Sequence, residues 1–227
     1  DSPNTLSFSL QQQQLKRFNF LHISSSFPRK GVDLLIKTFA EVFTAQDDVA
    51  LIIKTFPNPH NTVAQMLAAS RANRADFPQV ILIDEDWPQA QINALYAASH
   101  AFVAPSRGEG FGLPLAEAML WRLPVITTAW GGQTDFCSEQ TAWLCDFEFS
   151  RAQTHLGLTH SLWAEPSSAD LARHMKHLVS ATADDLQAKL DAAQTMVRKE
   201  LTWHACAERI KQAVAGIAQQ PKIRKEP

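Results

Sequence analysis

The sequence is poor in cysteine, and its three cysteines form no Cys-x-x-Cys pair. An odd number without such spacing argues against a disulfide framework and a zinc site, and is typical of a reducing compartment. No apolar run approaches the roughly 20 residues that a membrane-spanning helix needs. The N-terminus also lacks the basic and apolar regions of a signal peptide. These absences predict a cytoplasmic location and no membrane span.

The chain also lacks an excess of charge of either sign, with 21 Lys and Arg residues against 23 Asp and Glu residues. This balance provides no general basic surface for nucleic acid. No Gly-x-Gly-x-x-Gly sequence follows the first apolar segment, which argues against a dinucleotide oxidoreductase. Ser106 does not stand in a Gly-x-Ser-x-Gly elbow, which argues against a hydrolase nucleophile. The 45% of hydrophobic residues suffices for an ordinary globular core.

What the sequence has is a regular alternation of two kinds of segment. Short apolar segments predict buried strands at residues 18–24, 49–54, 80–83, 101–104, 124–127 and 142–145. Segments between them predict helices at residues 32–43, 61–73, 89–98 and 113–121. Apolar strands separated by helices are typical of a parallel sheet covered on both faces. We therefore predict an α/β fold with a Rossmann-like sheet that binds ligands at the carboxyl ends of its strands.

The C-terminal part departs from this alternation. Residues 148–166 resemble an inserted loop, and the chain then predicts helices at residues 167–180, 183–199 and 202–218. We divide the chain into a leading segment (1–17), a Rossmann-like domain with its insert (18–200), a C-terminal helix (201–220) and a charged tail (221–227). Because the chain begins with Asp1 and has room for only one such domain, we expect it to be part of a larger protein.

The strongest functional signal is residues 105–119 (PSRGEGFGLPLAEAM), which follow a predicted strand and run into a helix. Gly110 and Gly112 let the backbone approach a ligand, and the first helical amides carry the positive end of the helix dipole. Such a turn can cradle phosphate or hydroxyl oxygens. The carboxylate of Glu109 can accept hydrogen bonds from sugar hydroxyls, and Glu117 lies about two turns further on. A lone glycine pair is more often a tight turn, but the full string is more specific.

A second signal is residues 24–33 (SSSFPRKGVD), which follow the first predicted strand and open a helix. The adjacent cations Arg29 and Lys30 suit a diphosphate, and they can stabilise the negative charge of a departing nucleotide. An Arg-Lys pair before a helix is more often a solvated turn. Here it stands at a strand end of the same sheet as residues 105–112, the loop that carries Glu109 and is here called the glutamate loop. This position favours a shared site.

Two further strand ends carry weaker signals. In residues 127–135 (TTAWGGQTD), Gly131 and Gly132 can add backbone donors near a phosphate, although an ordinary connection explains them equally well. Ile83 and Asp84 end the third strand, at the start of an acidic cluster. The side chains of such a cluster are more often solvated than functional.

These segments resemble the retaining glycosyltransferases of family 4, whose domain is described as glycosyl transferases group 1. Residues 109–114 (EGFGLP) and the spacing of Glu109 and Glu117 match the E-x7-E signature of that family. Lys30 matches the lysine of its Lys-Gly pair, whereas Ser25 stands where the family usually has arginine. Arg29 resembles the arginine of a variant of this motif. The resemblance covers about residues 20–144 and implies the C-terminal half of a two-domain GT-B enzyme.

The resemblance also implies roles for the matched residues. Glu109 would contact the donor sugar, and Glu117 would hold the ribose hydroxyls. Backbone near Ile83 would meet the nucleobase. The remaining residues implied to lie at the sugar donor are Ser25, Asp84, Gly110, Phe111, Gly112, Leu113, Gly131 and Gly132.

The implied reaction moves a sugar from a nucleoside diphosphate sugar to an acceptor hydroxyl with retention at the anomeric carbon, as in bacterial polysaccharide biosynthesis. Arg29 and Lys30 would stabilise the departing diphosphate, so we expect neither a metal ion nor another cofactor. The acceptor would be bound by an N-terminal domain that this chain does not contain.

Two other functions stay open at this point. One is a nucleotide-sugar 2-epimerase on the same architecture, which would convert its donor without an acceptor. The other is a non-catalytic nucleotide-binding module of a larger polysaccharide-assembly protein, whose donor binding would be indifferent to Glu109→Ala. The sequence leaves the nucleobase, the sugar, the acceptor and the oligomeric state undetermined.

Overall fold

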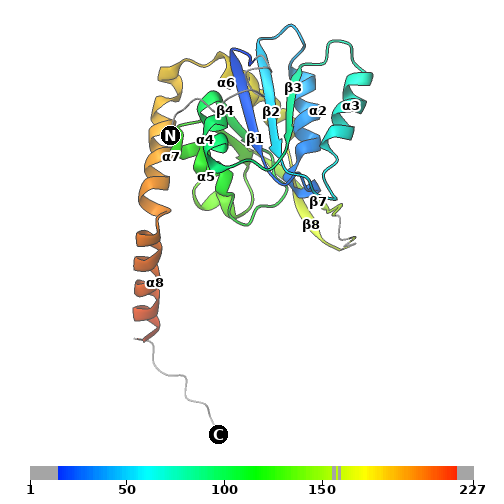
Figure 1. The fold of residues 1–227 in the computed structure, drawn as a ribbon. Coiled ribbons are helices and arrows are strands. Elements are labelled where there is room, and N and C mark those ends of the chain that lie inside the picture. Colours follow the sequence, from blue (N-terminus) through cyan, green and yellow to red (C-terminus); the bar gives the residue numbers. More distant parts are fainter. Residues whose placement is uncertain (1–14, 155–156, 158–159, 219–227) are drawn as a thin grey trace.

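The central element of the fold is a six-stranded parallel sheet in the order β3-β2-β1-β4-β5-β6 (Figure 1). The structure, a computed structural model, describes residues 15–154, 157 and 160–218, so most of the leading segment and all of the tail lie outside it. All six predicted strands are confirmed: β1 (Phe18–Ile23), β2 (Val49–Thr55), β3 (Gln79–Asp84), β4 (Ala101–Ala104), β5 (Val125–Thr128) and β6 (Trp143–Cys145). The strand order reverses between β1 and β4, where sheets of this kind bind ligands.

Helices cover both faces of the sheet, as the alternation predicts. One face carries α2 (Val32–Val42), α3 (Val63–Ala72) and α6 (Ser168–Ser180). The other carries α4 (Gln89–Ala98), α5 (Leu113–Leu120) and α7 (Ala183–Glu200). Two short 3₁₀ turns lie in loops at the carboxyl edge, η2 (Pro28–Lys30) and η3 (Gly132–Asp135).

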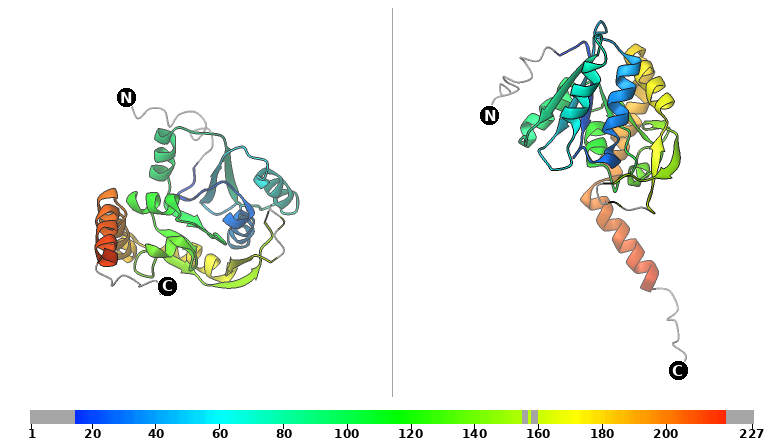
Figure 2. Two further views of the ribbon diagram at one scale, coloured as in Figure 1. Left: turned by 90° about the horizontal axis from the view of Figure 1, so that it is seen from below. Right: turned by 90° about the vertical axis from the view of Figure 1, so that its right-hand side faces the viewer.

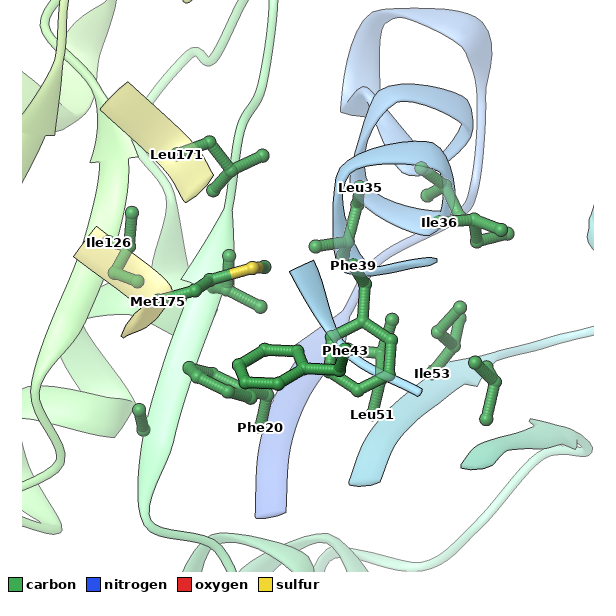
Figure 3. Close-up of a cluster of buried hydrophobic side chains, with 14 of the residues drawn as sticks. Phe20, Leu35, Ile36, Phe39, Phe43, Leu51, Ile53, Ile126, Leu171 and Met175 are labelled. Carbon is green, nitrogen blue, oxygen red and sulfur yellow. The ribbon is translucent and has the colours of Figure 1, made fainter. Parts of the chain in front are cut away.

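The core is split into two layers by the alternation of side chains along each strand. Phe20 of β1 packs against Phe39 and Phe43 at the end of α2, with ring centroids 6.2 and 6.1 Å away (Figure 3). The next residue, Leu21, points to the opposite layer beneath α4 and α5. Burying one such side chain contributes about 1.5–3 kcal/mol, which fixes the register of the strand that carries it.

The predicted insert is not a loop. β7 (Phe147–Arg151) and β8 (Leu162–Pro166) form an antiparallel hairpin beside the start of α2 (Figure 1). Each strand has only five residues, which is too short for its alternation to stand out in the sequence. Residues 155–156 and 158–159 of the insert lie outside the described part of the chain.

The last helix, α8 (Trp203–Ala218), follows α7 and projects away from the domain (Figures 1 and 2). Trp203 is 92% exposed, and Ile210 and Val214 are exposed at spacings that place all three on one side of the helix. Among the described residues, no helix is long and apolar enough to cross a membrane.

Candidate functional site

The loop after β1 is held against the loop after β4 by a close backbone approach. Gly31 ends η2 with a φ of 69°, in the left-handed region that favours glycine. A Cβ atom at this position would lie 2.0 Å from the carbonyl oxygen of Pro105. Glycine is therefore required here, and it brings Lys30 alongside the glutamate loop.

Lys30 and Glu109 form the central contact of the site. The Nζ atom of Lys30 lies 2.5 Å from Oε1 of Glu109, which also accepts a hydrogen bond from the hydroxyl of Ser106 at 3.1 Å. The two side chains are only 13% and 8% exposed. Burial lowers the pKa of Lys30 from its ordinary value, although the hydrogen bond and charge of Glu109 act in the opposite direction. The structure therefore brings these two predicted loops together, and their role as one ligand site stays a prediction.

Arg29 lies at the rim of the same site. Its Nη1 atom donates to the carbonyl oxygen of Gly108 at 2.8 Å and lies 3.8 Å from Oε2 of Glu109. Its side chain is about half exposed, so it is available to a ligand that arrives from solvent. The two predicted cations therefore flank one carboxylate.

A buried histidine sets the shape of the loop after β1. His22 Nδ1 lies 2.7 Å from the carbonyl oxygen of Val103, which can only accept, so Nδ1 carries the proton. Nε2 must then accept from the hydroxyl of Ser24 at 2.7 Å, and the Ser24 oxygen accepts the Ser26 amide at 3.0 Å. Burial lowers the pKa of His22 to about 4. The neutral ring thus fixes the loop that carries Arg29 and Lys30.

A cavity of about 300 Å³, here called the edge cavity, opens at the carboxyl ends of β1 and β2. Ser25, as predicted, lines it together with both cations. Lys54 adds a third cation whose Nζ donates to the carbonyl oxygens of Thr55 and Glu85 at 2.7 and 2.6 Å. The full lining is Ile23, Ser24, Ser25, Arg29, Lys30, Lys54, Thr55, Phe56 and Pro114.

Glu117 is positioned from a neighbouring helix. The hydroxyl of Tyr96 in α4 donates to Oε2 of Glu117 at 2.8 Å. Burial, together with the negative charge of Glu117, raises the pKa of Tyr96 well above its usual range, so this hydroxyl stays a donor. One oxygen of Glu117 is thus held in place.

One of the two glycines after β5 serves the site differently from our expectation. The amide of Gly132 donates to the carbonyl oxygen of Glu109 at 2.9 Å, so it is not a donor to a phosphate. Gly131 lies against the backbone of Glu109, where an added Cβ would be 3.2 Å from the Glu109 nitrogen. Because glycine has no side chain, the backbone after β5 can lie directly against the backbone of the glutamate loop. This close contact and the hydrogen bond from Gly132 hold the glutamate loop in position.

The segment that leads from Glu109 into α5 carries two exposed apolar side chains, whereas Gly112 is buried. Gly112 is the N-terminal cap of α5, and no side chain caps the helix there. The ring of Phe111 contacts the ring of Phe136 in a tilted arrangement, with ring centroids 5.2 Å apart. Phe111 and Leu113 are both exposed, and the contact of their backbone with a ligand stays a prediction.

The third predicted strand end lies further out. Ile83 is buried in the core, so only its backbone can meet a ligand, and Asp84 is exposed at the end of β3. Asp84, Glu85 and Asp86 form an Asp-x-Asp sequence, a pattern that often binds metal ions. Within the described residues, no group of three or more His, Cys, Asp and Glu side chains could hold a metal ion. Metal independence stays a prediction.

Sequence reasoning missed three residues that shape the site. Lys54 had a signal, a cation at the end of an otherwise apolar strand. His22 was hidden in an apolar run. Arg107 stood inside the strongest motif without a role, because its partners Asp33 and Glu165 are 74 and 58 residues away in the chain.

The fold and the site together define a Rossmann-like domain with cations and carboxylates at the topological switch point of its sheet. The chain belongs to the glycosyl transferases group 1 family, whose model matches residues 17–156.

Curated relatives support this membership. The O-antigen chain mannosyltransferase B of Escherichia coli is 27% identical over 202 residues, which are 87% of this chain and 46% of that protein. The D-inositol 3-phosphate glycosyltransferase of Segniliparus rotundus is 27% identical over 172 residues, 73% of this chain and 38% of that protein. The chain thus spans less than half the length of these relatives.

Solved structures show the same fold. The C-terminal domain of the group 1 glycosyl transferase LpcC from Francisella tularensis superposes with a TM-score of 0.65 at 18% identity, covering 86% of this chain and 91% of that one. Anabaena HepE, solved in complex with UDP and glucose, superposes with a TM-score of 0.68 at 19% identity, covering 95% and 53%.

Proposed function

We propose that this domain binds the nucleoside diphosphate sugar of a retaining glycosyltransferase. The observation that carries the proposal is the contact of Lys30 with Glu109, which puts a cation and a carboxylate from two strand ends into one site. A sugar diphosphate needs both: cations for its phosphates and an acceptor for its hydroxyls. The structure of HepE with UDP and glucose supports a nucleotide sugar as the ligand.

In the proposed reaction the bond between the anomeric carbon and the diphosphate breaks, and both electrons leave with the diphosphate. A bond to the acceptor oxygen forms on the same face of the sugar, and the proton of the acceptor hydroxyl passes to an oxygen of the departing diphosphate. Lys30 and Arg29 stabilise the charge that develops on the diphosphate, because donors fixed in advance cost no reorganisation during the reaction. Glu109 orients the sugar hydroxyls, and Glu117 holds the ribose.

The acceptor domain is proposed to be absent from this chain. The chain spans less than half the length of its relatives. On the projecting helix α8, Trp203, Ile210 and Val214 form an exposed apolar side. An apolar stripe of this kind is typical of a helix that packs against another element. We propose that the acceptor domain covers it. A cytoplasmic location also stays a prediction.

A thermal-shift panel of UDP-, GDP- and ADP-sugars tests ligand binding directly. A ligand that binds the native state raises the melting temperature, so one nucleoside class should stabilise this chain more than the others. Lys30→Met should abolish that shift. Lys37→Met is the matched control, because Lys37 lies exposed on α2 and makes only a 4.0 Å contact with Glu41. Equal shifts in both variants would refute the proposed site.

Two assays separate the alternatives. A 2-epimerase would change its nucleotide sugar when no acceptor is present, whereas a transferase domain would leave the sugar intact. A non-catalytic binding module would keep its affinity in Glu109→Ala. We expect that substitution to weaken binding of the sugar nucleotide more than binding of the free nucleoside diphosphate, because Glu109 is assigned to the sugar.

A further inference from the structure

A second cavity, of about 550 Å³, lies on the other side of the loop after β1. Ser24 and Ser25 line the edge cavity, whereas Ser26 lines this one, here called the hairpin cavity. Its outer wall comes from the β7–β8 hairpin and the residues just after β7, including Arg151, Gln153 and Trp163. Its volume falls within the range of about 300–1,000 Å³ that is usual for ligand pockets.

Arg107 fixes the walls of the hairpin cavity relative to one another. Its buried guanidinium donates to both oxygens of Asp33 at 2.7 and 2.8 Å and to both oxygens of Glu165 at 2.6 and 2.8 Å. It also donates to the carbonyl oxygen of Pro28 and lies 4.7 Å from the ring of Trp163. The start of α2, the loop after β1 and the hairpin are thus joined through one side chain. The Asp33 carboxylate also accepts backbone hydrogen bonds from its own residue and from Leu34, whereas Glu165, whose side chain is 34% exposed, can accept further hydrogen bonds from a ligand.

Ser26 is the second feature that points to a ligand. It is only 6% exposed, and its Oγ atom has no hydrogen-bond partner among the described residues. Its φ of 55° is unfavourable for a residue other than glycine and costs about 1–3 kcal/mol. A buried hydroxyl without a partner is also costly, so a ligand that reaches the Ser26 hydroxyl from the cavity would relieve this cost.

The charge of the hairpin cavity favours a neutral ligand. Apart from His60, its charged side chains are two cations, Arg107 and Arg151, and two anions, Asp33 and Glu165. These four charges sum to zero, whereas the edge cavity is lined by three cations. The hairpin cavity therefore offers a phosphate no net electrostatic attraction. Carboxylate and hydroxyl oxygens beside an indole ring suit a molecule with many hydroxyl groups and an apolar face.

We infer that the hairpin cavity binds a neutral pyranose unit that carries no nucleotide. It is a separate site from the one assigned to the donor sugar at Glu109. The binding of a sugar in this cavity does not depend on the proposed function. Only the assignment of that sugar to the acceptor glycan rests on the proposed function. The hairpin that builds this site also lies largely beyond residues 20–144, on which the family resemblance depends.

Amide NMR spectra of the ¹⁵N-labelled chain test the inference, with methyl glycosides of mannose, glucose and galactose as probes. We expect one of them to shift the signals of residues 26–27 and 150–153 and of the Trp163 indole. Ser26→Ala should weaken this binding about 3- to 10-fold, as expected for the loss of one hydrogen bond. Gln153→Trp should block it by filling the cavity from an exposed position. Ser180→Ala, at the far end of α6, is the control.

The outcomes separate this inference from the proposed function. Glycoside shifts in the hairpin cavity without any nucleotide binding would support the cavity and refute the proposed function. Nucleotide binding without any glycoside shift would do the reverse. Glycoside shifts confined to residues 24–25, 29–31 and 109–116 would place the sugar in the edge cavity and overturn the inference.

Discussion

Gly132→Ala is the substitution whose effect the structure defines most sharply. The added Cβ would lie 1.8 Å from the carbonyl oxygen of Gly110 and 2.6 Å from its carbon, whereas non-bonded carbons are comfortable at about 3.5 Å or more. Both contacts are backbone atoms, so no side-chain rotation relieves them. The loop after β5 must move away from the glutamate loop, and this movement breaks the hydrogen bond from Gly132 to Glu109.

The magnitude follows from these contacts. The lost hydrogen bond costs about 1 kcal/mol and the distorted backbone about 1–3 kcal/mol, so we expect a loss of about 2–4 kcal/mol in the free energy of unfolding. For a domain of this size that corresponds to a fall of roughly 5–15 °C in melting temperature. Because Glu109 is displaced, affinity for the sugar nucleotide should fall about tenfold or more.

Gly108→Ala is the matched control. It makes the same chemical change in the loop that is displaced by Gly132→Ala, but its Cβ would meet no atom within 4 Å, and its φ lies outside the left-handed region. We expect unchanged or slightly raised stability, since alanine restricts the unfolded chain. Calorimetry and a binding titration of both variants give the comparison. If Gly132→Ala kept the melting temperature and affinity of Gly108→Ala, the argument that these loops hold each other would be refuted.

Three further predictions concern the groups around the site. Because the pKa of His22 is about 4 in the folded chain and 6.5 in the unfolded chain, the unfolded chain takes up a proton first as the pH falls. The free energy of unfolding should therefore be at its full value above about pH 6.5 and should fall by up to about 3 kcal/mol toward pH 4. Urea unfolding should show this pH dependence in the parent but not in His22→Asn. Arg107→Met should cost about 2–4 kcal/mol because it leaves two partly buried carboxylates unpaired, whereas Arg209→Met, in an exposed pair, should cost under about 1 kcal/mol. Tyr96→Phe should weaken nucleotide affinity about fivefold, since Glu117 loses the donor that holds it.

Each of these has a contradicting result. Equal pH slopes in the two proteins would mean that His22 is not the titrating group. Similar losses for the two arginine variants would mean that the network around Arg107 is no stronger than a surface ion pair. Unchanged affinity in Tyr96→Phe would mean that Glu117 is placed by other contacts or does not bind the nucleotide.

Local patterns were sufficient to predict the sheet and its helices. Residues 49–53 are all apolar and the run is short and rich in β-branched residues, which favours a buried strand, and the one-sided spacing of apolar residues in 32–43 is that of a surface helix. The meeting of Lys30 and Glu109 could be predicted because both follow parallel strands, whose carboxyl ends share one edge.

What could not be predicted depends on partners that are distant in the sequence. Arg107 looks like any loop arginine until the fold brings Asp33 and Glu165 to it. The role of Gly132 depends on the backbone of Gly110 lying against it. Ser26 cannot be distinguished from Ser24 and Ser25 by sequence, because only the three-dimensional path of the loop divides them between two cavities.

The central claim is that the strand ends carrying Lys30 and Glu109 form one site for a nucleoside diphosphate sugar. An amide NMR titration of this chain with nucleoside diphosphates and their sugars tests it most directly. The account predicts saturable shifts that cluster in residues 24–31 and 109–116 and disappear in Lys30→Met. Saturable binding whose shifts lie elsewhere, or that Lys30→Met leaves intact, would contradict it.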